Sequence, residues 1–107
     1  MTPAIFGLEG LAVTASERAF FKDAAPVGYI LFGRNVADRE QLRRLTDDLR
    51  SISGRSALPI LIDQEGGRVA RMQSPQWLSY PPAAVFEAIF PRDPVAGAQA
   101  CRCNFEA

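Results

Sequence analysis

The residues best suited to chemistry lie in one charged segment that follows an apolar run. Leu58–Ile62 is almost wholly apolar, and Asp63 follows it directly, ahead of Gln64–Arg68 with the sequence Gln-Glu-Gly-Gly-Arg. A continuous apolar run is typical of a parallel strand that is covered on both faces. In parallel α/β folds, ligand-binding side chains gather at the carboxyl ends of such strands. We therefore predict that Asp63 is a ligand-binding carboxylate at the end of a buried strand.

The two glycines of this segment have alternative roles. Gly66 and Gly67 permit positive φ, and they also permit another group to approach the backbone closely. In the simpler alternative the glycines only turn the chain, and Glu65 and Arg68 form a surface ion pair that contributes little to stability. The residue types alone leave both alternatives open.

Composition and charge restrict the class of protein. The chain has 107 residues, which allows one small domain, and its 12 acidic and 12 basic residues cancel. This balance gives no indication of a nucleic acid or an acidic membrane as partner. The first residues lack the positive charge and the long apolar run of a secretory signal, and no other long apolar segment follows. We therefore expect a cytoplasmic protein.

The use of cysteine and histidine argues against metal sites and against the common nucleophilic sites. Cys101 and Cys103 are too close for an ordinary disulfide, and their spacing differs from the Cys-x-x-Cys pattern of zinc and redox sites. We expect free thiols and no metal. The chain contains no histidine, so it cannot hold a Ser-His-Asp or Cys-His site. Acid–base chemistry must come from carboxylates or from residues outside this chain.

Apolar runs alternate with helical patterns in the first part of the chain. Leucine and isoleucine at steps of three and four predict a helix over residues 38–53. Thr14 and Glu17 form a capping-box pattern, which predicts a shorter helix that ends near residue 25. Strands are predicted over residues 5–10, 27–33 and 58–62. Arg34 and Asn35 follow the second strand, and we assign them to loop and helix-start chemistry.

The last third of the chain is predicted to be less regular. A proline-rich loop follows Arg71, and a helical turn is predicted over residues 83–89. Asp93 and Pro94 then have the residue types of a helix cap and a first helical residue, which predicts a last helix.

Three strands and three helices in βα order predict an α/β fold with an open parallel sheet. A complete (β/α)8 barrel needs about 250 residues. We therefore expect residues 1–107 to be the amino-terminal portion of such a TIM barrel, a partial domain truncated at its carboxyl end. Its two unpaired sheet edges would recruit other strands, which predicts self-association.

Two motifs resemble those of a known enzyme family. Ile62–Val69, with the sequence Ile-Asp-Gln-Glu-Gly-Gly-Arg-Val, and the following Arg71 closely resemble the signature of bacterial β-N-acetylhexosaminidases of glycoside hydrolase family 3. Gly28–Asn35 resembles the second-strand motif of that family, except that Tyr29 stands where a small or aliphatic residue is usual. The resemblance extends from residue 7 to about residue 105. It implies the amino-terminal part of a barrel domain, with about three of its eight βα units.

The resemblance also implies an activity. Enzymes of this family remove terminal β-linked N-acetylglucosamine with retention, typically from muropeptides during cell-wall recycling in the cytosol, and use no metal or organic cofactor. Their aspartate nucleophile and histidine–aspartate acid/base pair lie on later loops of the barrel, which would be beyond Ala107 here. By resemblance this chain therefore holds no catalytic residue, in agreement with its lack of histidine.

Binding roles are implied for two residues. The family counterparts of Asp63 and Arg71 hydrogen-bond hydroxyl groups of the sugar at the non-reducing end, which suits a carboxylate acceptor and a guanidinium donor. Four residues between them are expected to shape the sugar-binding loop: Glu65, Gly66, Gly67 and Arg68.

Two functional alternatives stay open. Phosphorolysis in place of hydrolysis would depend on residues outside this chain. A non-catalytic α/β module that binds sugar weakly, stabilised by oligomerisation, would suit the small size of the chain.

Overall fold

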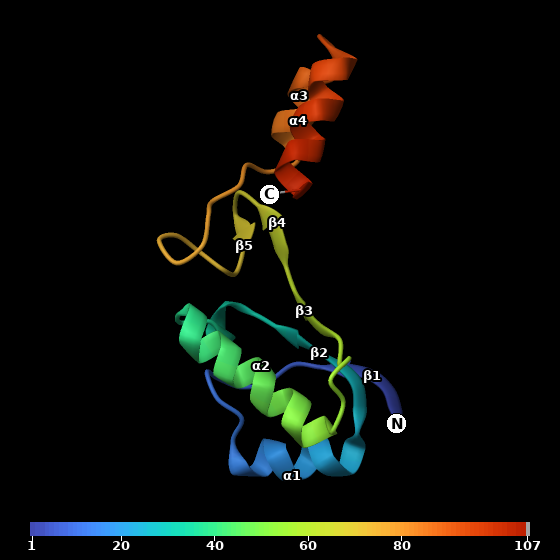
Figure 1. Ribbon diagram of the computed structural model, residues 1–107, viewed down its shortest axis with the longest axis vertical. Helices are drawn as coiled ribbons and strands as arrows, with labels where there is room; N and C mark the ends of the chain where they lie inside the picture. Colours follow the sequence, from blue (N-terminus) through green and yellow to red (C-terminus); the bar gives the residue numbers. More distant parts are fainter. Residues whose placement is uncertain (107) are drawn as a thin grey trace. The chain divides into compact units, whose positions relative to one another are not determined.

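The computed structural model describes residues 1–106 (Figure 1). These residues form two compact units, unit 1 over Met1–Asp63 and unit 2 from Gln64 onward. Unit 1 contains a parallel sheet and two α-helices, and unit 2 contains a β-hairpin and two further helices.

Unit 1 is built on three parallel strands. β1 (Thr2–Phe6), β2 (Pro26–Leu31) and β3 (Ile60–Ile62) lie in the order β1-β2-β3. This arrangement confirms the predicted α/β class with a parallel sheet, and it is compatible with a portion of a (β/α)8 barrel.

The prediction of a first strand over residues 5–10 is wrong, because β1 ends at Phe6. Beyond it the backbone bonds to side chains instead of to a strand. The carbonyl of Leu8 accepts hydrogen bonds from Arg34 and Asn35, and the carbonyl of Gly10 accepts another from Asn35. These side-chain donors replace the backbone donors that a longer strand would need.

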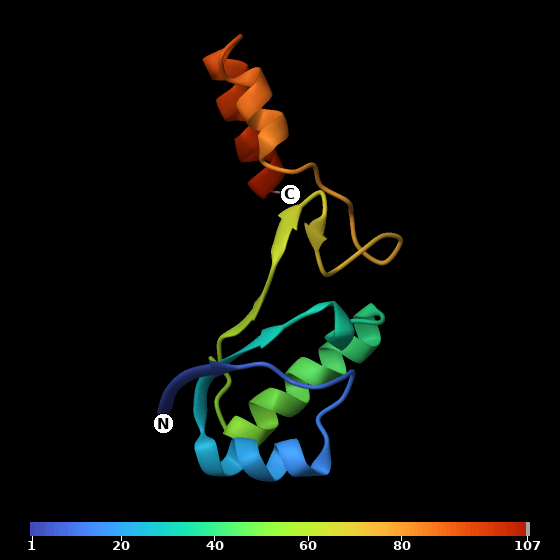
Figure 2. The ribbon, with the colours of Figure 1, turned by 180° about the vertical axis from the view of Figure 1, so that it is seen from behind.

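Helices α1 (Ala15–Ala24) and α2 (Arg39–Ser53) lie on the same face of the sheet (Figures 1 and 2). The predicted ends of α2 are confirmed: the Asp38 carboxylate accepts a hydrogen bond from the Gln41 N–H at 2.8 Å, and Gly54 closes the helix with φ of 68°. Between helices and sheet lies a core of buried residues: Leu8, Phe21, Tyr29, Leu31, Leu45, Leu49 and Leu58.

The tyrosine that departs from the family pattern is part of this core. Tyr29 has no exposed surface, and its ring meets that of Phe21 edge-on with centroids 4.9 Å apart. Within residues 1–106 its hydroxyl has no hydrogen-bond partner, and burial raises the pKa of the phenol. The large ring is therefore accommodated by packing and not by a polar contact.

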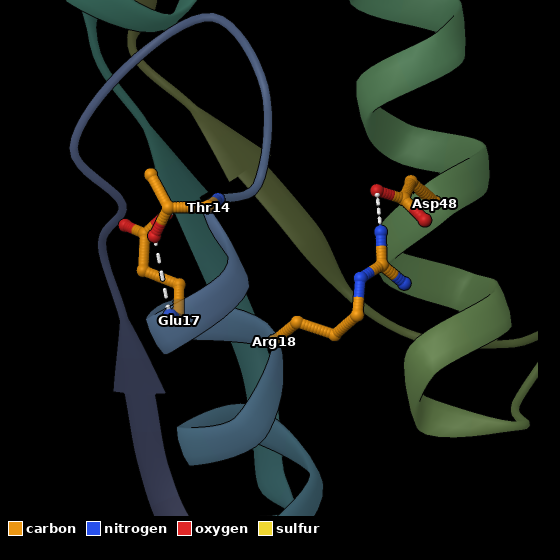
Figure 3. A network of polar contacts seen from close by, with 4 residues as sticks. All are labelled: Thr14, Glu17, Arg18 and Asp48. Carbon is orange, nitrogen blue, oxygen red and sulfur yellow. Dashed lines mark hydrogen bonds and ion pairs between the residues drawn. The ribbon is translucent and has the colours of Figure 1, made fainter.

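A network of polar contacts fixes the start of α1 and joins it to α2 (Figure 3). The Thr14 hydroxyl accepts a hydrogen bond from the Glu17 N–H at 3.2 Å, and the Glu17 carboxylate accepts one from the Thr14 N–H at 2.9 Å. This pair is the predicted capping box. The same carboxylate accepts a bond from the Glu9 N–H at 2.7 Å, and Arg18 is ion-paired with Asp48 at 2.5 Å.

We expect Glu17 to make the stability of unit 1 depend on pH. Burial alone raises the pKa of Glu17, but hydrogen bonds from the N–H groups of Thr14 and Glu9 and from the Thr14 hydroxyl outweigh it and hold the pKa below its ordinary value of 4.5. A lowered pKa stabilises the fold above the unfolded-state pKa, and this contribution is lost as the pH falls through the folded-state pKa. Glu17→Gln should therefore cost about 1 kcal/mol at pH 7, and this cost should shrink as the pH falls from 7 through the folded-state pKa of Glu17, which lies below 4.5. Urea unfolding of both proteins across this range tests the effect; a difference that does not vary with pH would contradict it.

The face of the sheet opposite the helices is open within unit 1. Ile5 and Leu61 on that face are 50% and 44% exposed, whereas Ile60 and Ile62 pack against the core. The prediction that residues 58–62 form a strand buried on both faces is therefore wrong for unit 1, because both of its helices lie on one side.

Unit 2 begins with a hairpin that was expected to be a loop. β4 (Gln64–Gly66) and β5 (Val69–Ala70) pair antiparallel. The loop expected directly after Asp63 is thus reduced to the two-residue turn between the strands. The strands have only 3 and 2 residues, too few for a periodic pattern in the sequence.

Two helices complete unit 2, where the sequence predicted them. α3 (Ala84–Ile89) and α4 (Pro94–Glu106) lie side by side. The Asp93 carboxylate caps α4 by accepting a hydrogen bond from the Ala96 N–H at 3.0 Å. Both cysteines, on α4, are free thiols, as expected. None of the helices in residues 1–106 is long and apolar enough to cross a membrane.

Candidate functional site

Asp63 is the last residue of unit 1, and it leaves the sheet at the carboxyl end of β3. The last registered pair of the sheet joins Leu31 to Ile62, so Asp63 comes one residue beyond the sheet, beside the end of β2. Side chains alternate along a strand. Because Ile60 and Ile62 pack on the helix side, this alternation assigns Asp63 to the open face, and its side chain is half-buried.

Asn35 builds the same end of unit 1 from the end of β2. Its side chain is completely buried. The amide oxygen accepts a hydrogen bond from the Phe32 N–H at 2.9 Å, and the amide nitrogen donates to the carbonyls of Leu8 at 3.1 Å and Gly10 at 2.7 Å. As predicted, this residue serves the loop structure. It joins the connection after β1 to the connection after β2.

Gln41 extends this polar cluster into α2. Its amide nitrogen donates to the carbonyls of Leu11 at 2.7 Å and Asn35 at 2.9 Å, and its amide oxygen accepts from the Ala37 N–H at 2.8 Å. The connections after β1 and β2, at the same end of the sheet as Asp63, are therefore fixed by side-chain amides. Such fixed connections are what a rigid binding site requires at the carboxyl ends of strands.

Arg71 belongs to unit 2. Its backbone position is determined by the side chain of Gln64, a role that was not predicted from the sequence. Gln64 donates from its amide nitrogen to the carbonyl of Met72 at 2.8 Å and accepts at its amide oxygen from the Met72 N–H at 3.0 Å. With Gln64 also paired to Ala70 in the hairpin, Arg71 lies between two anchored neighbours. Its side chain is half-buried. The only signal in the sequence for this anchoring role was the position of Gln64 inside the motif Ile62–Val69.

The two glycines turn the hairpin, and each also lies close against a proline. Gly66 and Gly67 have φ of 96° and 60°, a region that disfavours other residues. A Cβ on Gly66 would lie 2.3 Å from the carbonyl oxygen of Pro81, and one on Gly67 would lie 2.9 Å from Cβ of Pro82. The Gly67 N–H also donates to the carbonyl of Tyr80 at 2.9 Å. The glycines therefore hold the hairpin turn against the proline-rich loop.

The charged residues beside these glycines are exposed. In residues 1–106 no ion pair joins Glu65 to Arg68, whereas ion pairs do form at Arg18–Asp48, Glu40–Arg44 and Asp47–Arg50. The alternative that Glu65 and Arg68 form a surface ion pair is therefore wrong. The described residues also contain no group of three or more histidine, cysteine, aspartate or glutamate side chains placed to hold a metal ion.

Replacing Gln64 should loosen the backbone at Arg71. In Gln64→Glu the side chain keeps an acceptor for the Met72 N–H but turns a charged oxygen toward the Met72 carbonyl, so one hydrogen bond becomes a repulsion. We expect amide hydrogen exchange at Met72 to become about 10-fold faster. Gln99→Glu, at an exposed position of α4, makes the same chemical change and should leave this rate unaltered. Unchanged exchange at Met72 would show that Gln64 does not anchor this segment.

Comparison with known proteins identifies relatives of this arrangement. The beta-hexosaminidase of Aromatoleum aromaticum is 36% identical over 101 residues, which is 94% of this chain and 28% of that protein. The chain is homologous to the amino-terminal part of bacterial beta-hexosaminidases. It spans about 28% of the length of this relative. No protein-family model matches the chain.

Two solved structures of beta-hexosaminidase relatives agree with the fold. NagZ from Neisseria gonorrhoeae, in complex with N-trifluoroacetyl-D-glucosamine, matches with a TM-score of 0.78 and 33% identity, over 92% of this chain and 28% of that chain. A glycoside hydrolase family 3 beta-N-acetylglucosaminidase from Paenibacillus sp. str. FPU-7 matches with a TM-score of 0.69 and 29% identity, over 77% of this chain and 16% of that one. The homologues of this chain are thus glycoside hydrolases.

Proposed function

We propose that this chain forms the amino-terminal portion of a retaining β-N-acetylhexosaminidase barrel and supplies part of its site for terminal N-acetylglucosamine. One observation carries the proposal: Asp63, in a signature shared with this family, follows the carboxyl end of a parallel strand in a fold that matches NagZ. Binding of an N-acetylglucosamine analogue by the gonococcal relative supports a saccharide as ligand.

In this proposal the chain positions the sugar and does not cleave the glycosidic bond. The Asp63 carboxylate would accept hydrogen bonds from sugar hydroxyls, and the Arg71 guanidinium would donate to a hydroxyl oxygen. Glu65, Gly66, Gly67 and Arg68 would shape the loop around the sugar. Retaining hydrolysis needs a nucleophile and an acid/base group on either side of the scissile bond. We place both groups in the part of the enzyme that this chain does not include.

We also propose the cellular context implied by the family. The substrates would be muropeptide fragments released during cell-wall recycling, and the enzyme would act in the cytosol without a cofactor. Residues 1–107 would belong to a single barrel domain.

A chimera tests this proposal. Residues 1–105 of this chain would replace the matching amino-terminal part of gonococcal NagZ, and hydrolysis of a chromogenic N-acetyl-β-D-glucosaminide would be measured. We expect turnover within about 10-fold of the parent enzyme, because the matched segments are 33% identical and share their fold. A folded chimera without turnover would contradict the proposal.

The open face of unit 1 favours one alternative function, a non-catalytic module that self-associates. Ile5 and Leu61 are exposed there, and the strands at both edges of the three-stranded sheet have an unpaired side within unit 1. Sedimentation of the purified chain would show oligomers under this alternative, together with the absence of turnover in the chimera.

A further inference from the structure

We propose that the groove between α3 and α4 is a docking surface for a second copy of this chain, so that two copies pair through these helices. The groove is lined by residues of unit 2 alone, and pairing through it is a property beyond the proposed sugar binding. Three features of the helix pair carry the proposal: exposed phenylalanines along an apolar groove, a close contact that shapes it, and opposite charges on its two rims.

The groove has a volume of about 490 Å³ and a largely apolar lining. Its apolar side chains are Phe86, Phe90, Ala98, Cys101 and Phe105. Phe90 and Phe105 are 52% and 77% exposed, and Gly97 is the only buried residue in the described parts of α3 and α4. A helix pair that leaves aromatic side chains in solvent is stabilised when a further apolar surface covers them.

A close contact between the helices gives the groove a fixed floor. A Cβ built on Gly97 would lie 3.0 Å from Cα of Phe90 and 3.1 Å from Cδ2 of its ring, so the lack of a side chain at Gly97 lets the helices approach closely. This contact lies at the connected end of the pair, because only residues 90–93 link α3 to α4. Such a short link makes the two helices antiparallel. Positions equally far from the contact therefore face one another across the groove.

The rims of the groove carry one charge each, of opposite sign. Glu87 is on the α3 side and Arg102 on the α4 side, and both are exposed. Counted from the helix contact, Glu87 is three residues back along α3 and Arg102 five residues on along α4, so their levels differ by roughly 3 Å. None of the ion pairs in residues 1–106 includes either residue. Both charges are therefore available to a partner.

A second copy of the same surface pairs both charges at once. In a pair related by a twofold axis, a contact from one residue to another recurs in the opposite direction. An axis along the groove lays α3 of one copy over α4 of the other. Each Glu87 then faces Arg102 of the other copy, and the exposed phenylalanines of both copies are covered together. Any other partner would need an acid and a base placed in the same way, whereas a second copy has them by symmetry.

Sedimentation equilibrium of the 107-residue chain and its charge-reversal variants tests the pairing. Glu87→Arg and Arg102→Glu each create two like-charge contacts per dimer and should raise the dimer dissociation constant about tenfold or more. The double variant restores opposite charges and should return the constant to within about threefold of the original. Arg43→Glu, at an exposed position of α2, changes the net charge as Arg102→Glu does and should leave the constant unaltered.

Phe105 offers a test of the apolar contact that leaves the helix pair intact. Because its side chain is 77% exposed, Phe105→Asp should keep α4 folded while it places a charge in the covered surface. We expect the dissociation constant to rise about 30-fold or more, as for a central aromatic anchor. Val95→Asp makes a similar change on α4 at a residue that is 67% exposed and outside the groove lining, and it should have no such effect.

The two cysteines of α4 report where the copies meet. Cys101 lines the groove, whereas Cys103 is exposed and outside its lining. Alkylation with iodoacetamide followed by peptide mapping measures both thiols in one sample. When the chain is concentrated well above its dimer dissociation constant, we expect Cys101 to react about tenfold more slowly relative to Cys103.

Three results would overturn the proposal. A chain that stays monomeric at every concentration has no such docking surface. Dimers that ignore the charge reversals and leave Cys101 reactive form through another face, such as the open sheet of unit 1. Protection of Cys101 in the NagZ chimera but not in the concentrated chain would assign the groove to the rest of the barrel. None of these results bears on sugar binding, which the turnover of the chimera tests separately.

Discussion

Replacing Asp63 with asparagine in the NagZ chimera should reduce kcat/KM for a chromogenic N-acetyl-β-D-glucosaminide by about 100-fold or more. A hydrogen bond to a charged acceptor contributes about 1.5–3 kcal/mol, and a carboxylate that accepts from two sugar hydroxyls would lose most of two such bonds. Asparagine keeps the size of the side chain, so packing at the end of β3 is preserved. The steady-state rate at low substrate concentration measures this loss directly.

The matched control for this experiment is Asp23→Asn, an exposed aspartate on α1. It makes the same chemical change far from the carboxyl ends of the strands, and its rate should stay within about twofold of the chimera, as is usual for surface substitutions. A similar small effect of Asp63→Asn would show that Asp63 does not contact the substrate.

Asn35→Ala should destabilise unit 1 by about 3 kcal/mol, because three hydrogen bonds are lost at about 1 kcal/mol each. The variant leaves the Phe32 N–H and the Gly10 carbonyl without their side-chain partner, and it removes one of the two donors to the Leu8 carbonyl. Urea unfolding followed by circular dichroism measures the free energy of unfolding. The loss should appear as a lower midpoint with an unchanged slope.

Asn104→Ala on α4 is the control for this stability experiment. It removes the same side chain from a half-buried helical position in unit 2 and should change the free energy of unfolding by less than about 1 kcal/mol. If Asn35→Ala has an equally small effect, the amide cluster does not hold the two connections together.

The elements of unit 1 that carry local signals were predictable from the sequence. The capping box at Thr14, the cap at Asp38 and the glycine at the end of α2 are determined by residues within a few positions of each helix end. The structural role of Asn35 was also predictable, because amide side chains favour the turns that follow strands.

Other features could not be predicted from the sequence. They depend either on hydrogen-bond partners that are distant in sequence or on strands that are very short. β1 ends at Phe6, and the carbonyls of Leu8 and Gly10 beyond it bond to Arg34 and Asn35, more than 20 residues away. The hairpin of unit 2 has strands too short to show a period, and the anchoring of Met72 by Gln64 spans its turn. The apolar run before Asp63 predicted burial on both faces, but an apolar pattern does not say which part of a protein covers the second face.

Parallel measurement of turnover by the 107-residue chain and by the chimera is the most direct test of the claim that this segment binds the sugar while other residues cleave it. Both would be assayed with the chromogenic N-acetyl-β-D-glucosaminide, beside sedimentation to report assembly. We predict turnover by the chimera and none by the chain alone. Turnover by the chain alone that survives repurification would contradict this claim, because carboxylates within these residues would then be sufficient for catalysis.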